Sequence, residues 1–539
     1  MIFSIAKKDF LLNLVSSRFV IGFLLCLFLI PFTLLVNIDD YSEQLRVYTL
    51  DKAQADKNFK EVKVYSKLRP EIVKPPEPLS IFSGGISSNV GNRVKIWLGE
   101  KPLMATGKTA IRDNPLLNSF FSIDFISIIA IIMSLLALIF TYDLCTGEKE
   151  EGTLKLQLSN SISRYKILLG KVIGVYLTLL PIILFCYLLS FILILLSHTT
   201  EFSFDDWGCI CLLFLTSILF LSIFIFIGLF ISTRVHSSRV SIIVCLFFWV
   251  FFVFIIPNLS VYMAESFIKV QSRDNLQYAL DDLNREYGNK CSEYEKTLER
   301  PDWEMYWYFS GGSDGNKEIY GASKSQMEFH KKQNEFTEPF RIDYADKKWA
   351  FQKSYLDELD RQKNLAETIS LISPSELFRL VCSAVCRTDV NSHYRFMDRT
   401  RIYREEFTNY FKDKKIFSSF SYFTPVPPEI FMTADEIVRT RTGGEFKTLQ
   451  EYEEWMKNEE AKGTSMRSLF AHLGKVDIPE TDPNAYSYLD LSDVPMFQLQ
   501  AGDILNDLKE SLFKISALIL ISILLFYLSL MSFIKYDVR

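Results

Sequence analysis

The first candidate for chemistry is a stretch that approximates a phosphate-binding loop. Pro102–Thr109 has the sequence PLMATGKT, one residue away from the pattern GxxxxGK[ST], whose backbone N–H groups hold phosphate oxygens. Pro102 replaces the first glycine, although a glycine is needed where the backbone turns this sharply. No convincing strand precedes the stretch, so we do not expect it to bind a nucleotide.

Residue types that serve as metal ligands or catalytic groups are present but scattered. No histidine pair has a metal-binding spacing, and neither HExxH nor GxSxG occurs. Gly311–Gly315 (GGSDG) lacks the other acidic ligands of a calcium loop and is interpreted as a turn. Carboxylate pairs in the charged regions are interpreted as solvated helix faces. The sequence therefore predicts no catalytic residue, no metal site and no cofactor in this chain. The histidines are His198, His236, His330, His393 and His472.

The nine cysteines are also scattered along the chain. Five of them lie in apolar stretches, where cysteine packs as a small hydrophobic residue. Cys382 and Cys386 are four residues apart on an expected helix, which is neither a zinc nor a redox spacing. Unpaired thiols are therefore favoured over a disulfide at this pair. The five in apolar stretches are Cys26, Cys186, Cys209, Cys211 and Cys245.

The composition indicates that apolar blocks alternate with strongly polar blocks. Of the 539 residues, 49% are hydrophobic and 23% are charged, and the net charge is −5. So small a net charge gives no case for nucleic-acid binding, which a strongly basic face would indicate.

Six apolar stretches are long enough to cross a bilayer, which needs roughly 20 apolar residues in a helix. Buried core helices are the alternative, but six such runs almost free of charge favour membrane insertion. The first run is too long for a signal peptide, and no small-residue cleavage site precedes the polar turn expected at Asn37–Asp40. The third contains Pro181, where a kink is expected. The stretches are Phe19–Val36, Phe125–Thr141, Ile167–Ser197, Cys209–Ser232, Val240–Ile256 and Ile515–Ile534.

Lysine and arginine in the short loops set the expected orientation. Basic residues precede the first span, follow the sixth, and occur between spans two and three and between spans four and five. The loop 198–207 instead carries Glu201, Asp205 and Asp206 and no base. All basic loops fall on one side if both termini are cytoplasmic.

We therefore expect an all-α polytopic membrane protein with six transmembrane helices and both termini cytoplasmic. A smaller, mixed α/β extracytoplasmic segment joins spans one and two, with β-prone runs at Glu61–Tyr65 and Val94–Leu98. A large, mainly helical extracytoplasmic domain joins spans five and six, with helices expected in Ser266–Leu298, Ser323–Ile372 and Ser375–Phe411. The expected chain begins with a cytoplasmic interface helix, 1–18. The expected spans are 19–37, 125–142, 167–197, 209–232, 240–263 and 512–534. The extracytoplasmic regions are 38–124 and 264–511, the cytoplasmic loop is 143–166, the short loops are 198–208 and 233–239, and the tail is 535–539.

The loop between spans two and three is the most informative stretch. Gly147–Lys171 has the sequence GEKEEGTLKLQLSNSISRYKILLGK. It begins with three glutamates, continues through Gly152-Thr153 into leucines that alternate with polar residues, and re-enters the membrane after a polar turn. An ordinary amphipathic loop on the membrane surface is the alternative interpretation.

This loop resembles the signature of the ABC-2 type permeases, GE-x-E-x-GTL-x-L-L-S-x-P-x-S-R-x-x-x-x-x-GK. Asn160-Ser161 stands where that family often has a proline. Three further stretches resemble the branch of the family that has a large domain between spans five and six. These are Pro78–Gly85 (PLSIFSGG), Asp113–Asp124 (DNPLLNSFFSID) and Ile372–Arg404. The resemblance covers most of the chain and does not specify the cargo.

The resemblance implies a short coupling helix in this loop that docks on a separate ATPase subunit. ATP and Mg²⁺ would then be bound by two partner ATPases, and a second permease copy or a paralogue would complete the transporter in the inner membrane of a bacterium. An acidic cluster suits a basic rim on the ATPase. The residues carried over to the contact or its flanks are Glu148, Glu150, Glu151, Gly152, Thr153, Leu154, Arg164 and Lys171.

Three functions compete on this evidence. The first is an exporter permease, whose cargo is expected to be hydrophobic or amphiphilic because almost no charge lies within the spans. The second is a mechanical transmitter that drives a periplasmic partner through the large domain 264–511 without moving a substrate. The third is a membrane-anchored enzyme or receptor, which is disfavoured because it needs only one or two spans.

Overall fold

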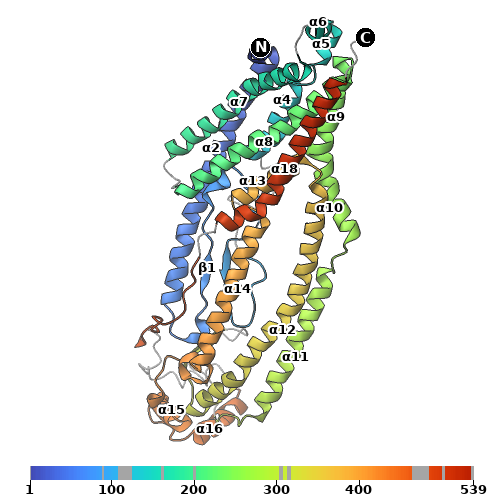
Figure 1. Cartoon of the computed structure of the whole chain (residues 1–539). Helices are drawn as coiled ribbons and strands as arrows, with labels where there is room; N and C mark the ends of the chain where they lie inside the picture. Colours follow the sequence, from blue (N-terminus) through green and yellow to red (C-terminus); the bar gives the residue numbers. More distant parts are fainter. Residues whose placement is uncertain are drawn as a thin grey trace.

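The structure is a computed structural model of the whole chain, and the residues that it describes are mostly helical, with two small two-stranded sheets (Figure 1). It describes residues 2–87, 90–106, 124–159, 163–197, 202–302, 308–311, 317–463, 485–499 and 504–535. Several sequence stretches discussed above lie partly outside these residues. They are Gly107–Thr109 of the loop-like motif, residues 113–123, Asn160-Ser161 and residues 312–315.

Five helices of the described residues are long and apolar enough to cross a membrane, by length and composition. The expected second span is also helical but shorter, Phe125–Ile139, so the count of six spans stays a prediction. The helices of this bundle are α1 (Ile2–Val15), α2 (Ser17–Lys60), α3 (Phe125–Ile128), a π-helical segment (Ile129–Met133), α4 (Ser134–Ile139), α7 (Arg164–Ser197), α8 (Phe204–Arg234), α9 (Ser238–Val250), a second π-helical segment (Phe251–Ile255), α10 (Ile256–Phe267) and α18 (Ile504–Ile534).

The first span does not end in the polar turn expected at Asn37–Asp40. Helix α2 continues for 44 residues to Lys60. Residues 41–60 contain neither glycine nor proline, and good helix formers dominate them. A pair on the same face, Arg46 with Glu43, adds the support that such spacing gives. The polar turn expected at Asn37–Asp40 was therefore wrong, because a change from apolar to polar residues does not by itself end a helix. The membrane boundary expected at residue 37 stays a prediction.

The two long polar regions of the sequence fold together into one unit, which we call the distal domain (the described residues within 61–106, 268–371 and 388–499). One apolar core contains residues of both regions, such as Val62 and Ile96 from the first and Ile342 and Phe407 from the second. Its elements are β1 (Glu71–Val73), β2 (Arg93–Lys95), α11 (Arg273–Thr297), β3 (Tyr308–Gly311), β4 (Lys317–Gly321), α12 (Lys324–Ser370), α14 (Val390–Asp413), α15 (Ala434–Arg441) and α16 (Leu449–Ala461).

The small sheets agree only in part with the β-prone runs. Strand β1 pairs antiparallel with β2, with Ile72 opposite Val94, so the run Val94–Leu98 does begin in a strand. The run Glu61–Tyr65 instead follows the end of α2 and leads into a 3₁₀ turn at Tyr65–Lys67. Helices α11 and α12 confirm the helical expectation for their stretches, and they pack against each other.

The expected helix over Ser375–Phe411 is two helices, and the first is not part of the distal domain. Helix α13 (Pro374–Val385) ends before Arg387, which has a left-handed φ of 57°. Its apolar face belongs to the same core as the membrane-type helices, and the ring of Phe378 stacks on that of Phe220 in α8, with centroids 4.4 Å apart. Figure 1 shows α13 between the apolar bundle and the distal domain.

Candidate functional site

Both chain ends and the loop after α4 lie at one end of the apolar bundle, which we call the loop end (Figure 1). The loop forms two short helices, α5 (Thr146–Glu150) and α6 (Thr153–Ser159). Gly152 joins them with φ of 73°, a left-handed conformation that glycine adopts without the clash that a Cβ would cause. The glycine of the GTL sequence is therefore explained by the turn between these helices.

One carboxylate of α5 connects four elements. The Oε2 atom of Glu148 lies 2.7 Å from the Nζ atom of Lys171 in α7. Its Oε1 atom accepts hydrogen bonds from Gln157 of α6 at 2.8 Å and from Lys8 of α1 at 3.2 Å. We call these four residues together with Asp9 the loop hub. Because it joins α1, α5, α6 and α7, any displacement of α5 strains contacts to all three neighbours.

Lys171 is the buried cation of the loop hub. It is 1% exposed, and its Nζ also donates to the backbone oxygen of Leu144 at 2.7 Å. A buried ammonium is tolerated only when it is paired and hydrogen-bonded. Glu148 supplies the charge and Leu144 supplies a neutral acceptor, so Lys171 fixes the position where the chain enters α5.

The pKa values of the two acids of the hub shift in opposite directions, although burial raises both. For Asp9, burial outweighs the attraction of Lys171 and Lys8, and the pKa is raised. For Glu148, burial also opposes ionisation, but Lys171, Gln157 and Lys8 outweigh it, and the pKa is lowered. Glu148 therefore carries the negative charge that balances Lys171.

Helix α1 packs closely on α7, and small residues permit it. A Cβ added at Gly170 would lie 2.8 Å from Ile5 Cβ, and one added at Gly174 would lie 3.0 Å from Asp9 Cβ. Glycines spaced by four residues let two helix backbones approach in this way. The expected interface helix is thus a structural partner of α7, and Ala6 is fully buried in the contact.

Basic side chains of the loop cap the ends of two membrane-type helices. Lys149 donates to the backbone oxygens of Ser232 (3.1 Å), Thr233 (2.7 Å) and Val235 (2.9 Å) at the end of α8. Arg164 donates to the backbone oxygen of Ile534 at the end of α18, at 2.6 Å. The last carbonyls of a helix have no partner within it, and cations there also interact favourably with the helix dipole.

Glu150 accepts hydrogen bonds from the start of α9, as the carbonyls at the end of α8 accept them from Lys149. The backbone N–H and the hydroxyl of Ser238 donate to its carboxylate at 3.0 and 2.8 Å. These bonds to Ser238 lower the pKa of Glu150. The loop therefore holds the adjoining ends of α8 and α9 through neighbouring residues of α5.

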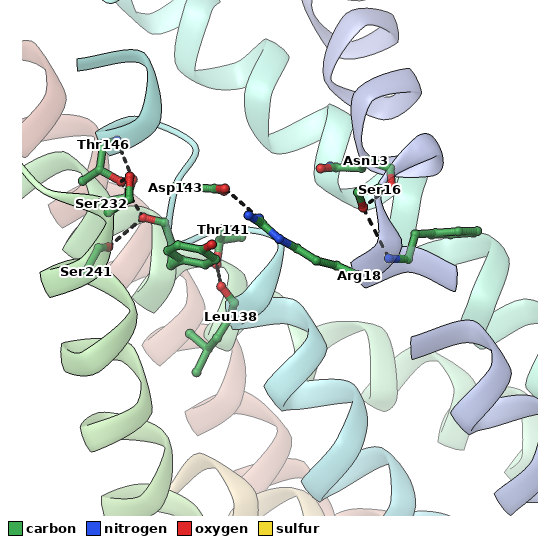
Figure 2. A network of polar contacts seen from close by, with 12 residues as sticks. Asn13, Ser16, Arg18, Leu138, Thr141, Asp143, Thr146, Ser232 and Ser241 are labelled. Carbon is green, nitrogen blue, oxygen red and sulfur yellow. Dashed lines mark hydrogen bonds and ion pairs between the residues drawn. The ribbon is translucent and has the colours of Figure 1, made fainter. Parts of the chain in front are cut away.

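Figure 2 shows the polar contacts that tie the residues before α5 to the surrounding helices. Arg18, near the start of α2, donates to Asp143 at 2.6 Å and lies 5.0 Å from the ring centre of Tyr142. The hydroxyl of Ser232 accepts from the N–H groups of Cys145 (2.9 Å) and Thr146 (3.2 Å). The loop is thus anchored at its entry as well as along α5.

The expected contact residues differ in where the structure places them. Glu148, Leu154 and Lys171 are directed into the protein, and Leu154 is 1% exposed. Thr153 donates to the backbone oxygen of Glu148 at 3.4 Å. Glu150, Gly152 and Arg164 hold helix ends or the turn, as described above. Glu151 is exposed. Contact of any of them with an ATPase stays a prediction.

Sequence reasoning missed two kinds of residue here. Lys8, Asp9 and Gln157 complete the hub, although α1 and α7 are far apart in the chain. Leu156, which is 69% exposed on α6, was not singled out. A signal existed for Asp9, because a carboxylate interrupts an otherwise apolar helix stripe, and for Leu156, because leucine there alternates with polar residues.

The family is established by comparison with known proteins. Five membrane-type helices among the described residues and their shared apolar core define a multi-pass membrane protein. Residues 3–429 match the family model described as ABC-2 family transporter protein, which is most of the chain. The chain therefore belongs to the ABC-2 transporter family. A comparison with curated protein sequences gave no match.

Proposed function

We propose that this chain is the permease subunit of an ATP-driven ABC transporter, with six spans and both termini in the cytoplasm of a bacterium. Two separate ATPase subunits supply hydrolysis, and a second permease copy or paralogue completes the path. The exported substrate is hydrophobic or amphiphilic. This proposal extends the family assignment with the geometry of the loop end.

The observation that carries the proposal is the exposed apolar residue on α6. Leu156 is 69% exposed, while the same helix is fixed from behind by the buried Leu154 and by the bond from Gln157 to Glu148. A rigidly held helix that presents a leucine beside charged residues suits insertion into a groove of a partner protein. Glu151 and Lys155 flank the leucine and provide a polar rim.

The test is affinity purification of the tagged chain from native membranes. The wild type is expected to bring down an ABC ATPase, and Leu156→Asp is expected to lose it because a charge replaces the apolar anchor. Tyr278→Asp is a matched control, since Tyr278 is 67% exposed on α11 of the distal domain. Retention of the ATPase by the stably inserted Leu156→Asp protein, or its absence from the wild type, would overturn the proposed docking role.

The position of α13 favours mechanical transmission as a second candidate function. Helices α8 and α18 are capped at the loop end by Lys149 and Arg164, and both pack against α13. Helix α13 is joined directly to α12 and α14 of the distal domain. Motion received at the loop end therefore has a packed route to the distal domain that needs no substrate.

Spin labels on the distal domain and on α2 test this second candidate. Tyr278 (67% exposed) and Leu50 (58% exposed) are suitable positions because labels there do not disturb the core. In the reconstituted complex, ATP is expected to shift the distance distribution between the labels. An unchanged distribution while ATP is being hydrolysed would rule out transmission through the distal domain and leave export alone.

A further inference from the structure

Three sulfur atoms from three separate segments meet inside the apolar bundle. The thiol of Cys26 in α2 donates to the thioether sulfur of Met133 at 3.6 Å. The side chain of Cys186 in α7 interacts with that of Cys26. The residues are 1%, 0% and 3% exposed in the order Cys26, Met133 and Cys186, and we call them the sulfur cluster.

The backbone around Met133 is unusual. Met133 is the last residue of the π-helical segment Ile129–Met133. Single-turn π segments widen a helix locally and occur frequently at functional sites. The segment is held in place by Ser134, whose hydroxyl donates to Ala130 O at 2.6 Å and accepts from the indole N–H of Trp249 at 2.9 Å. The thioether is therefore positioned by a fixed backbone.

The donor set selects the type of ligand. Thiolate and thioether sulfurs are soft donors that select Cu(I) over hard cations. Zinc is disfavoured, because structural zinc sites take four ligands from Cys, His, Asp and Glu. Among the described residues, no three side chains of those four types form a metal-binding group. The sulfur cluster offers two cysteine thiols and one methionine thioether as donors, and structural zinc sites do not use a thioether.

Charge balance also favours a monovalent ion. An isolated charge is costly in an apolar interior. If one thiol loses its proton on binding, one thiolate and one Cu(I) are neutral together, and the other thiol and the thioether are neutral donors. An S–H bond is replaced by an S–Cu bond, and the proton leaves to the solvent.

We propose that Cys26, Cys186 and Met133 form a binding site for one soft monovalent cation, Cu(I) or its analogue Ag(I). The site joins α2 to α7 and to the π-helical segment, so the bound ion connects three segments of the apolar bundle. Ordinary packing of small hydrophobic sulfurs is the alternative, and it predicts no metal affinity at these residues.

The test is a competition titration of the purified full-length protein in detergent, under anaerobic conditions, with the copper(I) complex of bicinchoninate as the metal source. The wild type is expected to remove one more equivalent of Cu(I) from the chelator than Cys26→Ser/Cys186→Ser. Cys245→Ser is the matched control, since Cys245 is also buried (1% exposed) but lies in α9, and it is expected to bind as the wild type does. Equal stoichiometry and affinity in the wild type and the double variant would overturn the proposal.

A second variant keeps the test decisive if the double variant does not fold. Met133→Leu preserves apolar volume, and substitutions of this kind disturb packing little. It is expected to weaken Cu(I) binding about tenfold, because only the thioether donor is lost. X-ray absorption of the copper-loaded wild type is expected to show sulfur ligands alone. Oxygen or nitrogen ligands, or an unaltered affinity in Met133→Leu, would contradict the assignment.

Discussion

Helices α8 and α18 are held in different ways at their two ends. At the loop end, Lys149 and Arg164 cap their last carbonyls, and the hydroxyls of Thr233 and Ser532 lie 2.9 Å apart between the two helices. Further along, α13 packs against both of them with an apolar face. The first attachment is polar and directional, and the second is apolar and extended.

This difference suits different roles for the polar contacts at the loop end and the apolar contacts of α13. A directional hydrogen bond is lost within a fraction of an ångström or a modest change of angle, whereas apolar contacts tolerate small sliding motions. Under the proposed transmission, the loop end would register a small displacement of α5 and α6, and the α13 contact would pass the resulting motion on. If these roles hold, variants at the loop end should alter the response to ATP, and variants at α13 should alter what reaches the distal domain.

The largest effect is expected for Lys171→Met. The change removes the buried partner of Glu148 and leaves it only the more exposed Lys8 of the loop hub as a counter-ion. Breaking a buried pair costs about 3–5 kcal/mol of stability. The melting temperature of the detergent-purified protein measures it. Lys155→Met on the exposed face of α6 is the control and should melt as the wild type does. An equally small shift for both lysines would show that the hub does not stabilise the loop end.

Phe378→Ala tests the apolar attachment. It removes a fully buried ring that stacks on Phe220. Lipid is as apolar as the ring, so the loss is mainly that of packing, and we expect about 2–3 kcal/mol. ATPase binding should be retained, while the ATP-dependent distance between labels on α2 and α11 should change less than in the wild type. If ATP changes the distance between the labels in Phe378→Ala as much as in the wild type, the transmission route does not pass through this ring.

Lys149→Met removes three bonds to the end of α8 at once. The expected loss of stability is about 1–2 kcal/mol, since water at the membrane surface replaces part of the capping. Hydrogen exchange of the last turn of α8 measures the effect locally, and faster exchange is expected there. The last turn of α7, which Lys149 does not contact, is the internal reference. Unchanged exchange at residues 231–234 would argue against the capping role.

Gly152→Ala should have the smallest effect. An alanine at a φ of 73° costs about 1 kcal/mol, and no atom lies within 4 Å of the added Cβ. The variant should insert normally and show a slightly lower melting temperature with weaker ATPase recovery, because α6 is reoriented. Gly147→Ala is the control, since Gly147 lies within α5 and has ordinary space around it. Identical melting temperatures and ATPase recovery in both variants would show that the turn at Gly152 does not affect docking.

The sequence predicted the membrane class, the family and the polar character of the loop correctly, because long apolar runs and a local signature need no tertiary information. It could not predict the hub, since Lys8 and Glu148 are brought together only when α1 packs on α7. It also could not predict that α13 packs among the membrane-type helices, because an apolar helix of twelve residues in a charged region resembles a soluble core helix. The sulfur cluster could not be predicted either, because its members are far apart in the chain and meet only in the folded bundle.

The unbroken course of α2 has a mechanical consequence. At 1.5 Å per residue, a helix of 44 residues is about 66 Å long, and it is fixed at its base by the contact of Arg18 with Asp143. Such a rod is a lever arm: a tilt of about 5° at the base moves the tip by about 6 Å, calculated from that length. Under the proposed transmission, a tilt of a few degrees at the loop would therefore displace the far end of α2 by more than one helical turn.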